Sequence, residues 1–172
     1  MMRRWLTAVL FTAPVLSLAD YHPLHAQERI GIAVGATPTA VEIEDLAGNP
    51  VDLSDYIGSG KPLLVEFWAT WCSNCEALEP AMLAAHSKYG EDANFLIVAV
   101  AVNQSVRRVR RYEADHEVPG RLLWDTDGRA TRAFMAPATS YVAVLDGEGS
   151  VVYTGLGPDQ DISAAVEKAL GR

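Results

Sequence analysis

Cysteine is scarce in this chain of 172 residues, which contains two of them. They are Cys72 and Cys75, so an internal disulfide would join neighbours three positions apart and would not tie distant segments together. A domain of this size buries roughly two-thirds of the surface that its unfolded chain exposes, and its core needs no disulfide. We therefore expect the pair to carry out chemistry rather than to hold the fold.

Positive charge is scarce as well. The 14 Lys and Arg residues are outnumbered by 22 Asp and Glu residues, and the formal net charge is −8. Binding to a phosphate backbone depends on Lys and Arg, so no nucleic-acid partner is expected. One arginine cluster, within residues 107–111, is interpreted as a solvated helix face, the usual setting of a charge run.

The histidines do not group into a metal site. Two of the four lie near the N-terminus, and none stands at a spacing from cysteine or acidic residues that would complete a set of ligands. Repeats and low-complexity tracts are also lacking. The sequence therefore predicts one globular domain with neither a bound metal nor another cofactor.

An apolar run at the N-terminus is too short to be a typical membrane span. Residues 5–18 are mostly apolar and follow Arg3 and Arg4, whereas a spanning helix needs about 20 apolar residues. This pattern predicts a signal peptide over residues 1–26, cut after Ala19 or Ala26. An uncleaved anchor is the alternative, and both interpretations place the protein in the periplasm or another extracytoplasmic compartment.

The remaining pattern predicts a linker over residues 27–39 and an α/β domain over residues 40–172. Two dense apolar runs are typical of strands buried on both faces, and alternating segments indicate hairpins. Such an order favours a central mixed β-sheet with helices on both faces. The expected strands are 41–43, 51–53, 63–68, 95–102, 122–124, 141–145 and 151–154, and the expected helical segments are 72–89, 106–117, 130–134 and 161–170.

The two cysteines lie where the strand over 63–68 passes into the helix over 72–89. Cys72 falls at the helix N-terminus, where free backbone N–H groups and the helix dipole stabilise a thiolate and lower the cysteine pKa below its usual value of about 8.5. Cys75 lies one turn inside and fits a resolving thiol. Trp71 stands beside the more exposed sulfur, where it shields the sulfur or contacts substrate.

Glu66 interrupts the apolar strand six residues before Cys72. A buried carboxyl group without a partner is costly and keeps its proton to a higher pH than usual. Beside the dithiol it would accept the proton of Cys75 and return it later. The alternative is a glutamate on a solvent-facing side of the strand.

The segment 65–75, Val-Glu-Phe-Trp-Ala-Thr-Trp-Cys-Ser-Asn-Cys, resembles the active-site segment of thioredoxin-fold proteins, with Pro80 downstream. It is most similar to the exported TlpA/ResA-type thiol–disulfide oxidoreductases, and the similarity extends from residues 41–48 to residues 146–149. The resemblance implies a thioredoxin-like fold with an N-terminal β-hairpin extension. It also implies that Cys72 is the nucleophile, that Cys75 is the resolving thiol and that Glu66 replaces a buried aspartate.

The family keeps a cis-proline that faces the dithiol, and Pro137 is our candidate for it and for a substrate contact. Counting back from Asp146, however, places the usual proline position near Ser140. Some relatives also carry a glutamate three residues after the second cysteine, where this chain has Leu78. Glu76 and Glu79 flank this position, and partial substitution by them is left open, although we expect helix geometry to direct both elsewhere.

The sequence therefore predicts an exported thiol–disulfide oxidoreductase that reduces disulfides of partner proteins through a mixed disulfide. The resemblance implies a membrane thiol reductase as its electron donor, and we expect a monomer. Two alternatives remain open. A peroxiredoxin-like peroxidase would need a threonine where Ala69 stands, and a copper-handling module would need a methionine or histidine beside the pair.

Overall fold

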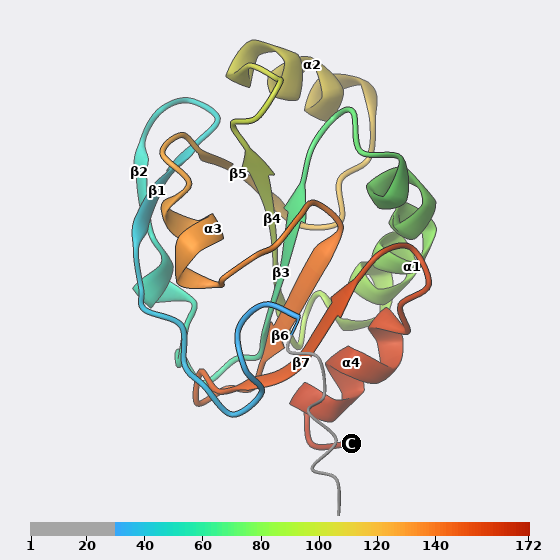
Figure 1. Cartoon of the computed structure of the whole chain (residues 1–172). Helices are drawn as coiled ribbons and strands as arrows, with labels where there is room; N and C mark the ends of the chain where they lie inside the picture. Colours follow the sequence, from blue (N-terminus) through green and yellow to red (C-terminus); the bar gives the residue numbers. More distant parts are fainter. Residues whose placement is uncertain (1–29) are drawn as a thin grey trace, which may run out of the picture.

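The computed structural model describes residues 30–172, which form one seven-stranded mixed sheet with helices around it (Figure 1). The predicted signal peptide over residues 1–26 lies outside the described residues. In the sheet the strand order is β2-β1-β5-β4-β3-β6-β7. The elements are β1 Glu42–Asp45, β2 Pro50–Asp52, β3 Leu63–Trp68, α1 Ser73–Tyr89, β4 Asn94–Val100, α2 Val106–Asp115, β5 Arg121–Asp125, α3 Arg129–Ala133, β6 Tyr141–Leu145, β7 Val151–Leu156 and α4 Ile162–Ala169, with a short 3-10 turn at Leu53–Asp55.

The middle of the sheet is formed by β3, which is buried at every position. It pairs in parallel with β4 and antiparallel with β6, and β4 continues in parallel to β5. A strand covered on both faces must be apolar nearly throughout, which its sequence Leu-Leu-Val-Glu-Phe-Trp satisfies apart from Glu66. The prediction of a fully buried central strand is confirmed.

Helices cover both faces of the sheet, as predicted. Successive side chains of a strand point to opposite faces, so Glu66 and Phe67 mark the two sides. The Phe67 ring meets Phe134, which follows α3, with 5.6 Å between ring centroids, and meets Tyr141 of β6 at 5.9 Å. On the Glu66 side α1 packs against α4, and Figure 1 shows these two helices across the sheet from α3.

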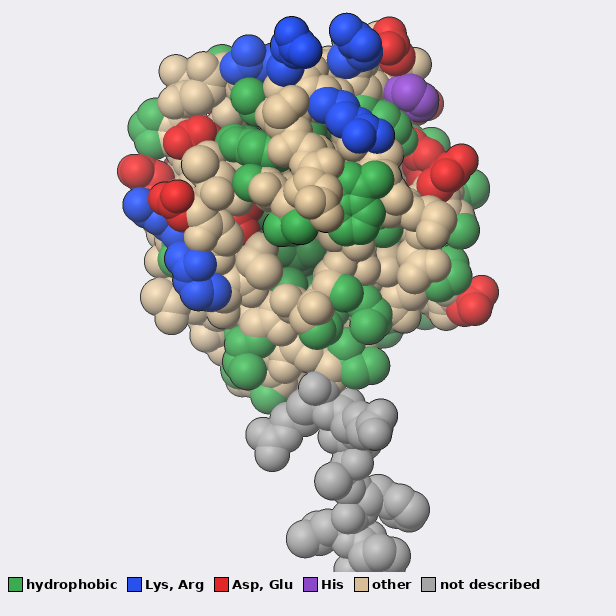
Figure 2. Space-filling view, turned by 45° about the horizontal axis from the view of Figure 1, so that its top comes forward, with side chains coloured by type: hydrophobic (Ala, Val, Ile, Leu, Met, Phe, Trp, Pro, Cys, Tyr) green, Lys and Arg blue, Asp and Glu red, His purple; other side chains and the backbone are tan. Residues whose placement is uncertain are grey.

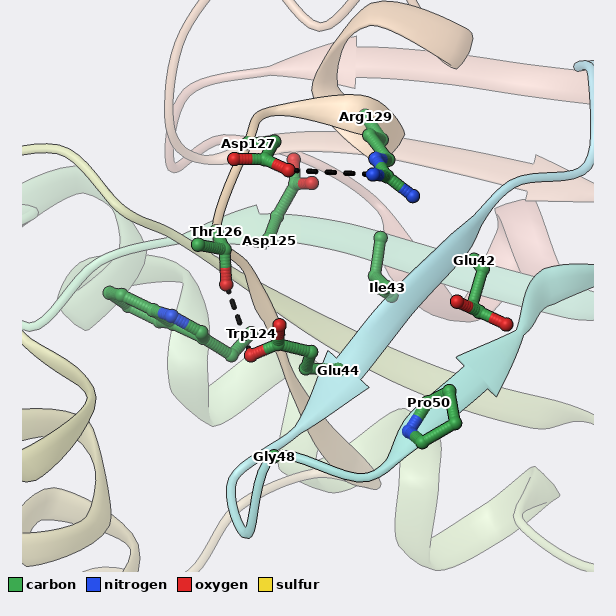
Figure 3. A pocket seen from close by; sticks show the side chains of 10 residues that line it. All are labelled: Glu42, Ile43, Glu44, Gly48, Pro50, Trp124, Asp125, Thr126, Asp127 and Arg129. Atoms are coloured by element: carbon green, nitrogen blue, oxygen red, sulfur yellow. Dashed lines mark hydrogen bonds and ion pairs between the residues drawn. The ribbon is translucent and has the colours of Figure 1, made fainter.

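The N-terminal hairpin predicted over residues 41–53 is present as β1 and β2. Its first strand pairs antiparallel with β5, which extends the sheet beyond its parallel centre. The Thr126 hydroxyl also donates to Glu44 Oε2 at 3.1 Å, across a hollow of about 340 Å³ (Figure 3). Asp125, buried beneath this hollow, accepts hydrogen bonds from the backbone N–H groups of Ala130 and Thr131 and so holds the start of α3.

Residues 30–39, which belong to the predicted linker, are bound to the domain by hydrogen bonds. The N–H of Ile32 donates to the Phe134 carbonyl and to the Tyr141 hydroxyl, both at 3.1 Å. Further along, the N–H of Gly35 donates to the Val151 carbonyl at 2.7 Å. Positive φ angles of 74° at Gly31 and 85° at Gly35 turn the chain back onto the sheet. Residues 30–39 are therefore a docked strap, which a search for periodic patterns does not detect.

The arginine cluster lies on α2, as predicted for a solvated face. Arg107, Arg108, Arg110 and Arg111 are all exposed, and Val109 is the residue of the helix that is fully buried. Figure 2 shows Lys and Arg side chains gathered at the top of the molecule, where α2 lies in Figure 1. The basic residues thus border the same end of the sheet at which β3 passes into α1.

Substituting the strap glycines tests how firmly the strap is docked. A Cβ atom at Gly31 would collide with the Tyr141 side chain, whereas one at Gly35 would meet no atom within 4 Å. Both positions have positive φ, so Gly35→Ala is a matched control for backbone strain. We expect Gly31→Ala to lower the free energy of unfolding by about 1–3 kcal/mol more than Gly35→Ala, measured by urea denaturation. Equal losses would show that the strap does not pack on Tyr141 in solution.

Candidate active site

The active-site turn joins β3 to α1, and a residue of the loop after β4 holds it in place. The N–H and the hydroxyl of Thr70 both donate to Gln104 Oε1 at 2.9 Å, and the amide of Gln104 donates to the Val100 carbonyl at 2.7 Å. The strand predicted over 95–102 ends at Val100, which leaves residues 101–105 free to form this clamp. Sequence reasoning missed Gln104, although the carboxyl ends of adjacent parallel strands meet at one sheet edge.

The two cysteines form a disulfide at the first turn of α1, with 5.3 Å between their Cα atoms. Cys72 is the N-cap residue, and its sulfur accepts a hydrogen bond from the Cys75 N–H at 3.1 Å. The exposed fraction is 7% for Cys72 and 1% for Cys75, so an incoming thiol or disulfide reaches Cys72 first. When the disulfide opens, the free N–H groups of the helix start stabilise negative charge on the Cys72 sulfur.

Glu66 lies below the disulfide in the apolar interior. Its exposed fraction is 3%, and its Oε1 atom has no hydrogen-bond partner. Burial, and next the negative charge of Glu79, raise the pKa of Glu66 to about 8. Glu66 and Cys75 line the same small cavity, which is about the size of one water molecule. The alternative of a solvent-facing glutamate is therefore wrong.

Glu79 is the residue whose placement the sequence analysis did not anticipate. It stands four residues after Cys75, which is about one helical turn, and it lines the cavity of Glu66 and Cys75. The expectation that helix geometry directs Glu79 elsewhere is wrong, because the spacing of four residues puts Glu79 on the same side of α1 as Cys75. The Tyr112 hydroxyl of α2 donates to Glu79 Oε1 at 3.1 Å.

Tyr112 is fixed between two rings. Its centroid lies 4.7 Å from that of Trp68 and 4.0 Å from that of His116, on which it stacks. Desolvation, followed by the hydrogen bond to Glu79 and the charges of the nearby glutamates, raises the pKa of Tyr112 to about 12. Tyr112 therefore remains a hydrogen-bond donor throughout the neutral range.

A larger cavity of about 590 Å³ opens on the other side of the turn, and its lining includes Trp71 and Pro137. The exposed fraction of Trp71 is 43%, and its indole N–H donates to the Val102 carbonyl at 2.8 Å, which fixes the ring over the cavity. The structure therefore brings together Trp71 and Pro137, the two residues predicted to contact substrate.

Pro137 is not a cis-proline, and that prediction is wrong: the peptide bonds of residues 30–172 are all trans. The residue directly before β6 is Ser140, as counting back from Asp146 indicated. Its N–H donates to the Phe67 carbonyl at 2.8 Å, and its φ of 62° makes the turn into the strand. Pro137 lies three residues earlier, in the loop, because β6 begins only at Tyr141.

Within residues 30–172, no three or more His, Cys, Asp or Glu side chains are grouped so that they could hold a metal ion. Ala69, where a redoxin-type peroxidase would carry a threonine, is a buried residue of the active-site turn and brings no hydroxyl toward Cys72. The assembled site thus consists of a disulfide, a buried acid and a half-buried Glu–Tyr pair, which is a set of groups for exchanging disulfides and moving protons.

Comparisons with known proteins agree with this chemistry. The chain is 28% identical over 142 residues to the thiol-disulfide oxidoreductase ResA of Geobacillus kaustophilus, covering 81% of this chain and 80% of that protein. It is 32% identical over 90 residues to a thiol:disulfide interchange protein TxlA homolog of Synechocystis, which is 52% of this chain and about half, 49%, of that relative.

Solved structures show the same fold. A thiol:disulfide interchange protein of the thioredoxin family from Chlorobium tepidum superposes with a TM-score of 0.67 at 23% identity, covering 81% of this chain and 99% of that one. The predicted thioredoxin-like fold is therefore confirmed. A family model described as Redoxin matches residues 33–170. Since this match spans most of the sequence, the chain belongs to the Redoxin family.

Proposed function

We propose that this protein is an exported thiol–disulfide oxidoreductase that reduces disulfides in partner proteins. The observation that carries the proposal is the Cys72–Cys75 disulfide at a helix N-terminus, with the more exposed sulfur at residue 72 and a buried acid below it. The names of the relatives support the reaction class. No second function is favoured by a specific observation.

The proposed cycle starts from the reduced protein. The Cys72 thiolate attacks one sulfur of a substrate disulfide and releases the other as a thiolate, which leaves a mixed disulfide on Cys72. Cys75 passes its proton to Glu66 and, as a thiolate, attacks Cys72 Sγ. This step forms the Cys72–Cys75 disulfide and releases the second substrate thiolate, so two electrons have moved to the substrate.

Substrate binding is assigned to the cavity beside Trp71 and Pro137. Its lining carries apolar side chains, and it opens next to the turn that presents Cys72. An extended segment around a partner's disulfide would lie there, with Trp71 as an aromatic anchor. Aromatic side chains in such positions commonly provide much of the binding energy.

Export and recharging complete the proposal. The pattern of residues 1–26 supports secretion, and a thiol reductase in the membrane would return electrons to Cys72–Cys75 outside the cytosol. None of the helices in residues 30–172 combines the length and the apolar character of a membrane span. We propose that the domain works as a monomer.

Cys75→Ser should trap the first half of the reaction. Without the resolving sulfur, the mixed disulfide on Cys72 accumulates, and non-reducing electrophoresis after exposure to disulfide-bearing substrate should show a crosslinked species. Cys72→Ser is the matched control and should give none. Adding Trp71→Ala to Cys75→Ser should reduce the trapped fraction about tenfold at limiting substrate if Trp71 anchors the partner. Equal trapping by the two cysteine variants would contradict the proposed roles.

The reduction potential of the Cys72–Cys75 couple determines the direction of electron flow. We expect a value near the roughly −270 mV of thioredoxin, because the proposed role is reductive. Equilibration with glutathione or dithiothreitol, followed by alkylation of free thiols, measures it. A value near the roughly −120 mV of strongly oxidising periplasmic proteins would reverse the assigned direction.

Glu66→Gln should impair the step that uses Cys75 and also change the pH dependence of stability. The resolving step should slow by about 100-fold, the lower end of what positioned proton transfer contributes. Folding raises the pKa of Glu66 from 4.5 to about 8, so between these pH values the folded state holds a proton that the unfolded chain has released. The free energy of unfolding of the oxidised protein should therefore fall as pH rises through this window.

In the Glu66→Gln variant this fall should be smaller, on the order of a few kcal/mol less, since each pKa unit corresponds to about 1.4 kcal/mol. Urea denaturation at pH 5, 7 and 9 compares the two proteins. A parallel pH dependence in both would mean that folding does not raise the pKa of Glu66.

A further inference from the structure

Two cavities meet at the active site and share part of one wall. The inner cavity is lined by Glu66 and Cys75, and a surface groove of about 220 Å³ is lined by Cys72 and Trp71. Three residues line both, namely Trp68, Glu79 and Tyr112. Of these three side chains, Glu79 is the one with a carboxylate, which can accept and release a proton, whereas the Tyr112 phenol, with its pKa raised to about 12, keeps its proton.

Glu66 needs such a neighbour because it is cut off from bulk water. It can accept the Cys75 proton only when it is ionised, and with a pKa of about 8 it is mostly protonated at neutral pH in the disulfide form. Its proton must first leave, yet 3% of its surface is exposed and Oε1 has no hydrogen-bond partner. A carboxylate on the cavity wall would give this proton a path to the solvent.

Glu79 is held at the wall that the two cavities share. The Tyr112 hydroxyl donates to Glu79 Oε1, and the Tyr112 ring contacts the Trp68 and His116 rings. Of the other titratable groups nearby, Glu76 and His116 line the groove but not the inner cavity, and Glu117 lines the inner cavity but not the groove. The charge of Glu79 is the one that acts on Glu66.

We propose that Glu79 relays protons between Glu66 and the groove beside Cys72, and that Tyr112 is the residue that positions it. The inference rests on the proposed function. Before resolution, protonated Glu66 gives its proton to the Glu79 carboxylate, and Glu79 releases it to a base in the groove. Ionised Glu66 then takes the Cys75 proton, and the Cys75 thiolate forms the disulfide with Cys72 as the substrate thiolate leaves. In the reductive half-cycle the protons move the opposite way.

The test follows the reduced full-length chain mixed with the chromogenic disulfide 5,5′-dithiobis(2-nitrobenzoate) in a stopped-flow instrument. Attack by Cys72 releases the first thionitrobenzoate, and attack by Cys75 on the resulting mixed disulfide releases the second. The first phase is an internal control for a folded and accessible site. The second phase is measured from pH 5 to 9 in weak buffer, with and without added imidazole.

In Glu79→Gln we expect the plateau rate of the second phase to fall about tenfold, less than for loss of a direct proton acceptor, because water partly replaces the relay. Imidazole should restore it. Tyr112→Phe should give a smaller loss that imidazole also restores. Two control variants each remove one negative charge near the relay, Glu76→Gln in the groove and Glu117→Gln in the inner cavity. Their plateau rates of the second phase should stay within about twofold of that of the parent protein.

Several results would overturn the relay. A shifted pH midpoint with an unchanged plateau would mean that Glu79 acts on Glu66 through its charge alone. A larger loss of plateau rate in Glu117→Gln than in Glu79→Gln would mean that the Glu66 proton leaves through Glu117. A double variant of Glu66 and Glu79 should be no slower than Glu66→Gln, so additive losses would show independent roles.

If the second phase is missing in the parent protein, the proposed function itself fails. If the second phase is intact in Glu66→Gln, only the roles of the acids fail.

Discussion

A carboxyl group kept in an apolar interior without a hydrogen-bond partner is the constraint around which this site is arranged. Burying Glu66 costs stability that an apolar residue at the same position of β3 would not cost. The surrounding strand, with buried neighbours on both faces, holds the side chain in place against that cost. The result is an acid that exchanges its proton near neutral pH, directly beneath a sulfur that has to lose and regain one.

The reactive turn combines two kinds of support. The start of α1 supplies backbone N–H groups and the favourable end of the helix dipole to Cys72. The loop after β4 supplies Gln104, which binds the preceding turn through Thr70. Helix α2 then covers the inner cavity with Tyr112. Elements separate in sequence therefore control the charge of the sulfur, the geometry of the turn and access to the acid.

Much of this arrangement could be predicted from local sequence. The density of apolar residues in 63–68 identified a strand covered on both faces, and that burial placed Glu66 inside. The spacing of Cys72 and Cys75 fixed their position on the first helical turn. Contacts between distant segments could not be predicted in this way. The spacing of four residues puts Glu79 on the Cys75 side of α1, but its partner Tyr112 belongs to α2, and no periodicity within α1 reports that neighbour.

The errors at Pro137 and in the strap have the same origin. A proline at a loop–strand junction suggested the cis residue of the family, but the register between β3 and β6 pairs Tyr141 with Phe67, so Ser140 is the residue directly before the strand. Residues 30–39 lack a periodic pattern because hydrogen bonds to distant backbone groups and the buried side chain of Ile32 in the core, rather than a regular apolar face, hold them. The register of β6 and the position of residues 30–39 both depend on contacts with segments that are distant in the sequence.

The clamp made by Gln104 separates two properties that are usually adjusted together. One amide joins the loop after β4 to the turn before Cys72, so the orientation of that turn is determined by a residue outside the Cys-Ser-Asn-Cys segment. A substitution at this single distant position would therefore remove a support of the turn while the residues between the cysteines, and the surface they offer to other proteins, remain the same.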